Sequence, residues 1–423
     1  MQTAPKSFIL STGSEITEGL YADTNARDLS QILKDNGFLT VGHRAMRDEP
    51  EEIKEAIRSA TRSADLLIST GGIGPTQDDL NREIIASVYQ RPLRRIHQAE
   101  VLLRQRFKRR QRTLPHENLK QTDVPEGAEP LLNFWGTATG FFIPPAQGLA
   151  GILVLPGVPR EWTAMMERYF PRIIQRYYPN RPCFYTDTIH TVMLAESEIN
   201  SRLKPLFTSS PDVTLALLAK RGHVRIRIMA EAATKEQAKQ RSIEVRDEIL
   251  PLLPQEVVLS VGEENLTIEE KLVELFRTQG KTLALAESCT GGGIAKRITD
   301  VAGSSAVLGL CCVTYSNAMK TAMLGVSEEI LATHGAVSED CVKAMCAGVL
   351  QISGADVALA VSGIAGPDGG SPEKPVGTVW FALGTQGKQP KTFEIHYPGD
   401  RLEVRSWAEN QGLDLLRKTL TGN

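Results

Sequence analysis

Short apolar runs alternate with amphipathic stretches along the first 178 residues. Residues 7–11, 38–43 and 65–69 have strand character. Apolar residues recur at helical spacing from Ala26 to Leu33 behind the capping candidates 23–25, and a second helix is predicted over 51–60. This alternation is typical of a doubly wound α/β domain, with a mostly parallel sheet and helices on both faces.

Two further segments follow a linker-like stretch at 178–182. Residues 179–258 predict a small α+β unit, with strands at 186–192, 213–219 and 224–230 and helices at 196–203 and 235–250. Residues 262–423 predict a second α/β domain, with an amphipathic helix at 267–279 and strands at 283–287 and 306–314. A chain of 423 residues is long enough for these three domains.

Composition narrows the class of protein. The chain is 41% hydrophobic and 23% charged, as soluble globular proteins are. Its 48 basic and 50 acidic residues give no argument for a nucleic-acid or membrane surface, and the basic run at 104–112 is best interpreted as a solvated helix face. No signal peptide, membrane-length apolar run or C-x-x-C pair is present, so we expect a reduced, cytoplasmic protein.

A serine and a glycine-rich turn follow the strand predicted at 283–287. Ser288 stands at the end of the strand, and a helix is predicted to begin after the glycines at 291–293. Such a turn exposes the hydroxyl and directs unpaired backbone N–H groups at a phosphate or at an oxyanion. Cys289 is a rival nucleophile, because a thiol at a helix N-terminus can have a lowered pKa.

The serine hydroxyl needs a base to become a nucleophile. His334 and His396 are the only histidines beyond residue 262, and neither stands in a recognisable triad. Lys320 precedes the apolar run at 322–324, and burial would lower the pKa of its amine from about 10.4 towards that of a base. A lysine on a partly apolar helix is more often a surface residue, so the pattern alone leaves both roles open.

A second glycine-rich loop follows the strand predicted at 65–69. Gly71, Gly72 and Gly74 would let backbone N–H groups approach a phosphate. Asp78 and Asp79 follow, and with Asp48 they are candidates to hold a divalent cation through oxygen ligands. The alternative is a plain glycine turn with an acidic N-cap.

Several motifs in the first domain occur in the order found in the CinA family. They lie at 13–15, 23–26, 70–76 with 78–79, 118–121, 133 with 136–138, and 155–161. In this respect the sequence resembles that family, whose N-terminal domain is similar to molybdopterin-binding proteins. The resemblance implies an ADP-ribose pyrophosphatase that depends on a divalent cation (Mg, Co or Mn) and potassium. It implies phosphate contacts from Gly71, Gly72, Gly74 and Thr76, pocket walls with Asn25 and Glu161, and metal or acid–base roles for Asp48, Asp78 and Asp79.

Four residues depart from the family pattern in this domain: Gln77, Asn81, Thr139 and Trp162. None of them removes an aspartate candidate. Together they support ligand binding more than hydrolysis. Simple binding of a molybdopterin-like or nucleotide ligand is therefore the alternative function of this domain.

The third domain resembles the CinA C-terminal domain, which also occurs as the free-standing nicotinamide mononucleotide deamidase. The matching motifs lie at 286–292, 303–305, 315–317 with Lys320, 335–338, 363–367 with 369–370, and 375–378. The resemblance implies an amidohydrolase without a cofactor, in which Ser288 is the nucleophile, Lys320 the base, and Tyr315 and Ser362 assist. Threonine is usual at position 362, and serine keeps the hydroxyl. The substrate-binding candidates are Cys289, Thr290, Gly291, Gly292, Gly303 and Gly363, with Arg401 and Arg405 for the phosphate.

The middle segment resembles a KH-type domain but contains no G-x-x-G clamp between residues 179 and 258. We therefore expect a spacer or dimer contact rather than a nucleic-acid module. The family likeness also implies a homodimer. An interaction role in competence or DNA repair is the alternative to an enzyme, although the near-neutral charge gives it no support.

Overall fold

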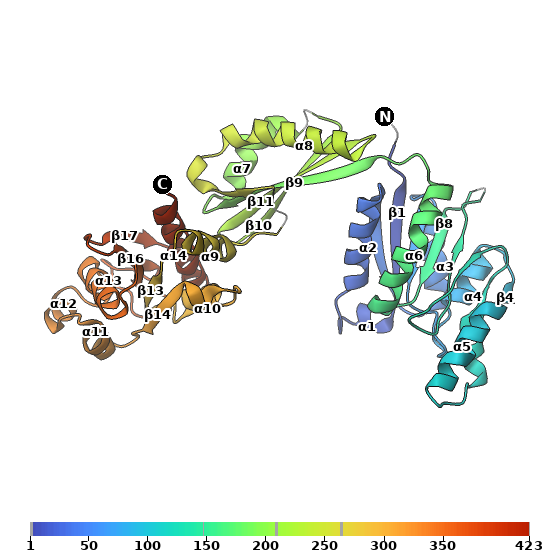
Figure 1. The fold of residues 1–423 in the computed structure, drawn as a ribbon, viewed down its shortest axis with the longest axis horizontal. Coiled ribbons are helices and arrows are strands. Elements are labelled where there is room, and N and C mark those ends of the chain that lie inside the picture. Colours follow the sequence, from blue (N-terminus) through green and yellow to red (C-terminus); the bar gives the residue numbers. More distant parts are fainter. Residues whose placement is uncertain (1–2, 147, 208–209, 263–264, 423) are drawn as a thin grey trace. The chain divides into compact units, whose positions relative to one another are not determined.

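The computed structural model describes residues 3–146, 148–207, 210–262 and 265–422 (Figure 1). The chain divides into two compact units. One comprises residues 1–185 with 231–238, and the other comprises 186–230 with 239–423.

The first unit is built on a six-stranded sheet of order β2-β1-β3-β8-β7-β6. The strands are β1 (Lys6–Thr12), β2 (Leu39–Met46), β3 (Leu66–Thr70), β6 (Glu129–Leu131), β7 (Gly140–Ile143) and β8 (Gly151–Leu155). β2, β1, β3 and β8 are parallel, and β7 and β6 continue the sheet in antiparallel fashion. β4 (Leu93–Arg95) and β5 (Asp123–Pro125) form a separate antiparallel pair.

Helices cover both faces of this sheet. They are α1 (Ser14–Thr17), α2 (Thr24–Asp35), α3 (Pro50–Ala60), α4 (Asn81–Val88), α5 (His97–Arg109) and α6 (Pro159–Tyr177), with the 3₁₀ helix η1 (His116–Thr122). Side chains alternate along each strand, so Ile9 packs with α2 and α6, whereas Leu10 packs with α3 and α4. Asp23 caps α2 by accepting a hydrogen bond from the Ala26 amide, as the sequence predicts.

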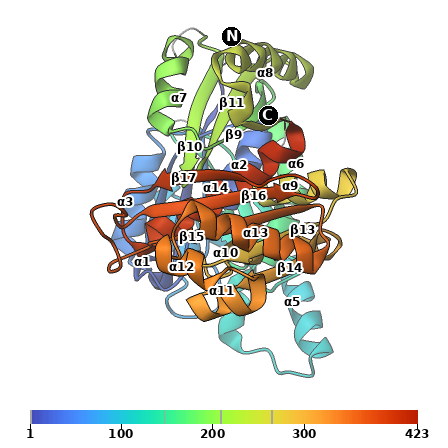
Figure 2. The same cartoon turned by 90° about the vertical axis from the view of Figure 1, so that its left-hand side faces the viewer.

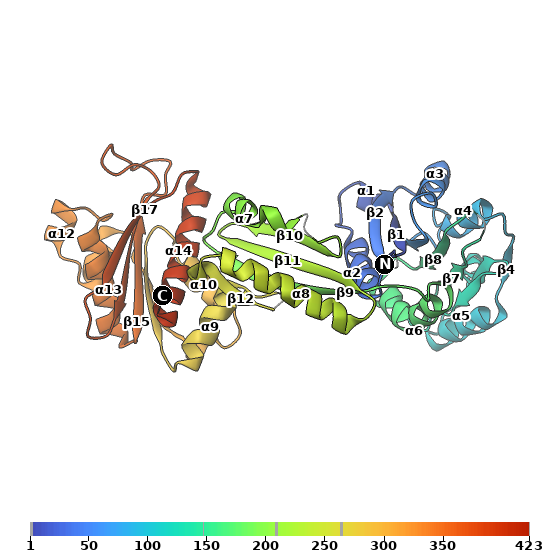
Figure 3. The same ribbon diagram turned by 90° about the horizontal axis from the view of Figure 1, so that it is seen from above.

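The second unit holds one whole sheet and most of another, because the ends of two strands and one helix fall among residues 183–185 and 231–238 of the first. The smaller has the order β10-β11-β9-β12, formed by β9 (Cys183–Val192), β10 (Val213–Lys220), β11 (His223–Ala232) and β12 (Val258–Val261). Its helical segments are α7 (Glu196–Leu203), η2 (Lys204–Phe207), α8 (Lys235–Ile249), η3 (Leu250–Leu252) and η4 (Gln255–Val257). The two α-helices lie on one face, where Ile199 and Val245 pack against Ile226 (Figure 3).

The larger sheet has the order β14-β13-β15-β16-β17. Its strands are β13 (Leu283–Glu287), β14 (Leu308–Val313), β15 (Val357–Gly363), β16 (Thr378–Thr385) and β17 (Lys391–His396). β13 lies between parallel β14 and β15, and β16 and β17 continue in antiparallel fashion. The carboxyl ends of β13, β14 and β15 therefore share one edge.

Two helix layers enclose this sheet (Figure 2). The helical elements are α9 (Ile268–Thr278), α10 (Gly293–Thr299), η5 (Ser304–Ala306), α11 (Asn317–Leu324), α12 (Glu328–Thr333), α13 (Glu339–Ser353) and α14 (Arg401–Thr421). Leu283 and Leu285 face α9, α10 and α14, whereas Ala284 and Ala286 face α13. The small alanines let α13 lie close to the central strand.

The predicted fold class is confirmed: each of the three segments is a mixed α/β structure with the predicted strand–helix alternation. All six cysteines are free thiols. Within the described ranges, no helix combines the length and the apolar character needed to cross a lipid bilayer.

Gly71 has a requirement for glycine that can be tested. Its φ is +92°, and a Cβ there would lie 2.5 Å from the Thr12 carbonyl oxygen. Gly71→Ala should therefore lower the opening free energy of β1 and β3 by roughly 1–3 kcal/mol, measured by amide hydrogen exchange. Gly19→Ala is the control, because Gly19 also has positive φ (+75°) but nothing within 4 Å of its Cβ position. Equal effects of both substitutions on β1 and β3 would contradict the steric argument.

Candidate active site

Ser288 and Lys320 meet at the carboxyl edge of the larger sheet. Lys320 Nζ donates hydrogen bonds to Ser288 Oγ at 3.0 Å and to the Thr314 carbonyl at 2.7 Å. Ser288 follows β13, and Thr314 follows the neighbouring parallel strand β14. Ser316 caps α11 by accepting from the Met319 amide, and this helix start brings Lys320 back over the edge.

The surroundings of the lysine favour its neutral form. Lys320 is 1% exposed, and Ser288 is 8% exposed. Burial lowers the pKa of the Lys320 amine, and the nearby Cys341 and Cys289 thiols oppose this shift in part. The amine therefore has the two properties that a general base needs, which are contact with the hydroxyl and a reduced affinity for its proton.

Glu287 holds the turn that carries Ser288. Its carboxylate is fully buried and accepts hydrogen bonds from the amides of Gly292 (2.9 Å), Ile294 (3.3 Å) and Ala295 (2.8 Å). The Gly291 amide donates to the Ser288 carbonyl at 3.0 Å. The expectation that the amides of Gly291 and Gly292 serve an anion is therefore wrong for this structure, because internal acceptors already occupy them.

Cys289 lies on the other side of the turn, in the hydrophobic core. It is 6% exposed and packs among the residues beneath α14. Burial raises the pKa of the Cys289 thiol to about 12; the amides of Cys289 and Thr290 oppose this rise, and the Glu287 carboxylate adds to it. The thiol is protonated at neutral pH, which removes the property that made it a rival to Ser288.

Two arginines one turn apart on α14 reach the edges of the site. Arg401 donates to the Tyr315 hydroxyl and to the Gly366 carbonyl, both at 2.8 Å. Arg405 donates to the Thr290 carbonyl at 2.8 Å, and its Nε is buried without a hydrogen-bond partner. Tyr315 is 61% exposed, so this side of the site is open to solvent.

The other sequence candidates of this domain divide into two groups. Ser362 lies on β15, but its hydroxyl donates to the Ala336 carbonyl at 2.7 Å and has no described bond to the dyad. A Cβ at Gly363 would lie 3.1 Å from Cys289 Sγ, so Gly363 borders the turn. Gly303 precedes β14 at the amino edge of the sheet, beside Arg277. The assignment of Gly303 to the substrate site is therefore wrong, because its motif lies at the wrong end of the strand.

The glycine loop of the first unit packs tightly over the ends of β1 and β3. A Cβ at Gly72 would lie 2.7 Å from Asn81 Nδ2, and one at Gly74 would contact the Asp79 carboxylate. Asn81 is buried and donates to Thr12 Oγ1 (2.6 Å) and to the Gly71 carbonyl (2.8 Å). Asn81 is one of the residues that depart from the family pattern, and here it ties the loop to the sheet.

Asn25 and Glu161 have structural partners at the same edge. The Asn25 side chain donates to the Gly157 carbonyl at 2.8 Å and accepts from Trp162 Nε1 at 2.9 Å. Glu161 accepts from Asn133 Nδ2 at 2.7 Å. These bonds hold the two side chains near the carboxyl ends of β3 and β8, and their role as pocket walls stays a prediction.

The three aspartates are coupled electrostatically but do not form a ligand set by themselves. Burial raises the pKa of the Asp48 carboxyl, and the hydrogen bond from the Ser14 amide lowers it in part. The neighbouring charges of Asp78, Glu15 and Asp79 raise it further. Asp79 is already engaged by the Thr76 amide (2.9 Å) and hydroxyl (2.5 Å). Among the described residues, no three His, Cys, Asp or Glu side chains lie close enough together to hold an ion by themselves. Mg²⁺ is commonly held by one or two carboxylates together with substrate phosphates, so Asp48 and Asp79 would share the implied cation with the ligand.

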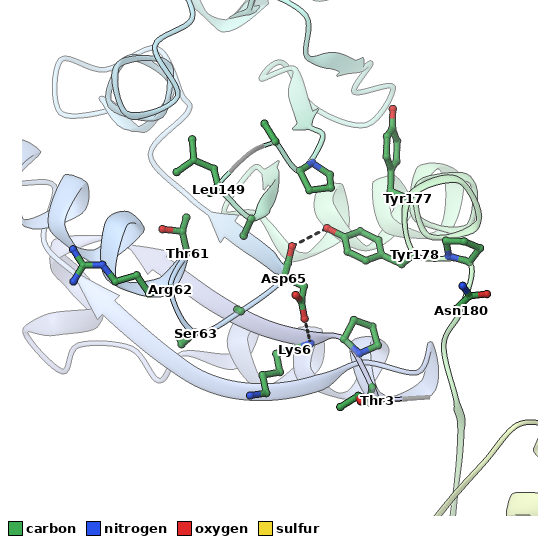
Figure 4. Close-up of a pocket in the computed structure, with 18 residues that line it drawn as sticks. Thr3, Lys6, Thr61, Arg62, Ser63, Asp65, Leu149, Tyr177, Tyr178 and Asn180 are labelled. Atoms are coloured by element: carbon green, nitrogen blue, oxygen red, sulfur yellow. Dashed lines mark hydrogen bonds between the residues drawn. The ribbon is translucent and has the colours of Figure 1, made fainter. Parts of the chain in front are cut away.

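A cavity of about 910 Å³ in the first unit lies elsewhere (Figure 4). Lys6, Asp65 and Ala150 line it at the amino ends of β1, β3 and β8, opposite to the glycine loop. Asp65 is held there by the Lys6 amide (2.7 Å) and by the Tyr178 hydroxyl (2.9 Å). None of the predicted site residues lines this cavity.

Sequence reasoning missed two residues that organise the candidate active site. Thr314 supplies the second acceptor for Lys320, and Glu287 holds the turn. Glu287 gave a usable signal, because a carboxylate inside an apolar strand directly before a glycine turn needs buried donors.

Comparisons with known proteins agree with the three segments. Family models match residues 8–175 (probable molybdopterin binding domain), 186–258 (damage-inducible protein CinA KH domain) and 265–420 (CinA C-terminal domain). The KH and molybdopterin-binding likenesses expected from the sequence are thereby confirmed.

Full-length relatives are also similar. A putative competence-damage inducible protein of Symbiobacterium thermophilum is 39% identical over 421 residues, covering 97% of each chain. A CinA-like protein of Geobacter metallireducens is 39% identical, covering 98% of this chain and 99% of its own. The solved competence/damage inducible protein CihA of Agrobacterium tumefaciens is 41% identical over 38% of this chain and 99% of its own, with a TM-score of 0.35. The identity over nearly the whole length shows that this chain belongs to the CinA family.

Proposed function

We propose that the C-terminal domain hydrolyses the carboxamide of nicotinamide mononucleotide, giving nicotinic acid mononucleotide and ammonia. The observation that carries the proposal is the buried 3.0 Å contact between Lys320 Nζ and Ser288 Oγ. The substrate follows from the resemblance of the domain's motifs to the free-standing nicotinamide mononucleotide deamidase.

The reaction would proceed through an acyl-enzyme. Neutral Lys320 takes the proton of the Ser288 hydroxyl while Oγ attacks the carboxamide carbon. The Lys320 ammonium then gives this proton to the departing amide nitrogen, which leaves as ammonia. Water next attacks the ester, with Lys320 again as the base, and releases the carboxylic acid and the Ser288 hydroxyl. The Thr314 carbonyl orients the amine throughout.

Arg401 and Arg405 would supply the positive charge for the substrate's phosphate. They lie one turn apart at the start of α14, on the elements that border the dyad. Guanidinium groups bind phosphate through charge-assisted hydrogen bonds, which suits a mononucleotide better than an uncharged amide.

Removing the hydroxyl tests the nucleophile. Ser288→Ala should reduce ammonia release from nicotinamide mononucleotide by at least about 10³-fold, because no other group can form the ester. Cys289→Ala should keep most of the activity, since the Cys289 thiol is buried and protonated. The reverse pattern would assign the reaction to Cys289. An interaction role in competence would be independent of Ser288, so the Ser288→Ala protein would then still rescue a deletion strain.

The lowered pKa of Lys320 predicts a pH dependence of stability. Between the folded pKa and the higher unfolded pKa, the unfolded chain binds more protons, so the free energy of unfolding rises with pH. In Lys320→Met this contribution is absent. Urea unfolding from neutral pH to about pH 9.5 should therefore show the wild type gaining stability relative to Lys320→Met. A constant difference would mean that the pKa of Lys320 is not lowered.

For the N-terminal domain we propose binding of the ADP-ribose phosphates at the loop of Gly71, Gly72 and Gly74. The support is the glycine loop at the carboxyl edge of parallel strands, where doubly wound sheets bind ligands. Cleavage of ADP-ribose with Mg, Co or Mn is the finer proposal that the family likeness suggests. Its assay compares hydrolysis with and without each added cation.

Asp48→Asn tests how the Asp48 charge affects ADP-ribose binding in the absence of a cation. Without a cation, the Asp48 carboxylate would repel the phosphates, so Asp48→Asn should tighten ADP-ribose binding several-fold in calorimetry. Glu49→Gln is the control, because Glu49 also precedes α3 and the pKa of Asp48 does not depend on it. Weaker binding by Asp48→Asn in the absence of cations would contradict the charge argument.

A further inference from the structure

A cavity of about 750 Å³ lies in the second unit, apart from Ser288. The turn between β10 and β11 forms one wall, and residues of α9, α10 and α14 form the other. Its volume is within the range of cavities that hold small ligands. None of the residues assigned to the amidase site lines it.

The described lining of this cavity is strongly basic. Lys220, Arg221, Arg225 and Arg297 line it, and Glu269 is the one carboxylate among them. Arg297 pairs with Glu269 at 2.5 Å and Arg221 with Glu403 at 3.3 Å, whereas Lys220 is an exposed side chain at the turn. The excess of positive charge suits an anionic ligand.

The other part of the lining is planar and apolar. His190 and His223 stack with ring centroids 5.1 Å apart, and their Nδ1 and Nε2 atoms are 3.0 Å apart. Burial lowers the pKa of His223 to about 4, with His190 and Lys220 adding to the shift, so its ring is neutral at pH 7. Leu217 and Leu266 lie on the same lining. A neutral aromatic surface next to aliphatic side chains suits a flat ring.

Asn410 fixes the base of the cavity. Its side chain donates to the Arg221 carbonyl at 3.0 Å and accepts from Arg297 Nη1 at 2.8 Å. Gly222 has φ +72°, and a Cβ there would lie 2.7 Å from Asn410 Nδ2, so the turn fits against α14 only with glycine. The cavity is thus a built junction of three elements.

The same elements continue to the candidate active site. Arg297 lies on α10, whose first amides hold Glu287 and thereby the Ser288 turn. Asn410 lies on α14, whose first turns carry Arg401 and Arg405. A ligand that moved Arg297 or Asn410 would act on both of these supports.

We propose that this cavity binds a nucleoside monophosphate, with the phosphate among the cations and the base against His223 and the leucines, and that its occupation alters the reaction at Ser288. The site is separate from the amidase site. The coupling rests on the proposed amidase function, whereas the binding does not.

Calorimetric titration of the full chain with AMP tests the binding. Lys220→Glu should weaken one AMP-binding event by about tenfold or more, because a charge-assisted contact becomes a repulsion. Lys239→Glu on α8 is the matched control, since Lys239 is also exposed and lies outside the cavity. Binding at any other site is common to all three proteins. Coincident isotherms for wild type and Lys220→Glu would overturn the proposal.

Steady-state ammonia release from nicotinamide mononucleotide tests the coupling. AMP should change KM or kcat at least about twofold in the wild type and in Lys239→Glu, and should leave Lys220→Glu unchanged. AMP binding at the cavity with no kinetic change would overturn the coupling and keep the site. If no variant releases ammonia, the proposed amidase function fails, and the titration still decides whether the cavity binds AMP.

Discussion

The Lys320 amine that contacts the Ser288 hydroxyl is buried, and this burial decides what the contact can do chemically. An exposed lysine is charged at neutral pH and has no lone pair to accept a proton. Burial against the sheet edge lowers the pKa of the amine and so acts against the charged form. The Thr314 carbonyl gives the amine one acceptor, and no carboxylate is paired with it in the described structure. A nearby carboxylate would have stabilised the ammonium form instead. A pocket without a paired carboxylate therefore favours the base role that we propose for Lys320.

Glu287 determines the surroundings of Cys289, which is adjacent to Ser288. A helix N-terminus beside a cysteine tends to produce a reactive thiolate, and α10 begins four residues after Cys289. Here the Glu287 carboxylate takes the first amides of that helix and adds negative charge near the thiol. The amides of Gly292, Ile294 and Ala295 therefore bond to Glu287 and hold the turn that carries Ser288. Burial is the main cause of the raised pKa of the Cys289 thiol, and the Glu287 carboxylate adds to it.

The sequence was sufficient for the parts of the fold set by local pattern. Apolar patterning located α9 and β13, and the order of motifs paired Ser288 with Lys320 across 32 positions. The sequence did not show which end of a strand a matching motif would occupy. Gly303 belongs to a matching motif but precedes its strand, so it lies at the opposite edge of the sheet from Ser288. For the aspartates of the first unit, the sequence located neighbouring charges but not their ligand geometry, because that geometry depends on side-chain directions that a linear spacing does not specify.

α14 links most of the middle segment to the CinA C-terminal domain within one compact unit. Polar side chains of α14 contact two different regions. Arg401 and Arg405 bond to Tyr315 and Thr290 beside the Ser288–Lys320 pair, and Asn410 bonds to the turn between β10 and β11. Its buried leucines, such as Leu413 and Leu416, anchor it in the core beneath β15. A helix fixed in this way transmits a displacement at one end as a rigid element rather than absorbing it. The KH-like segment thus contacts α14 through its β10–β11 turn, at Asn410 and at Glu403.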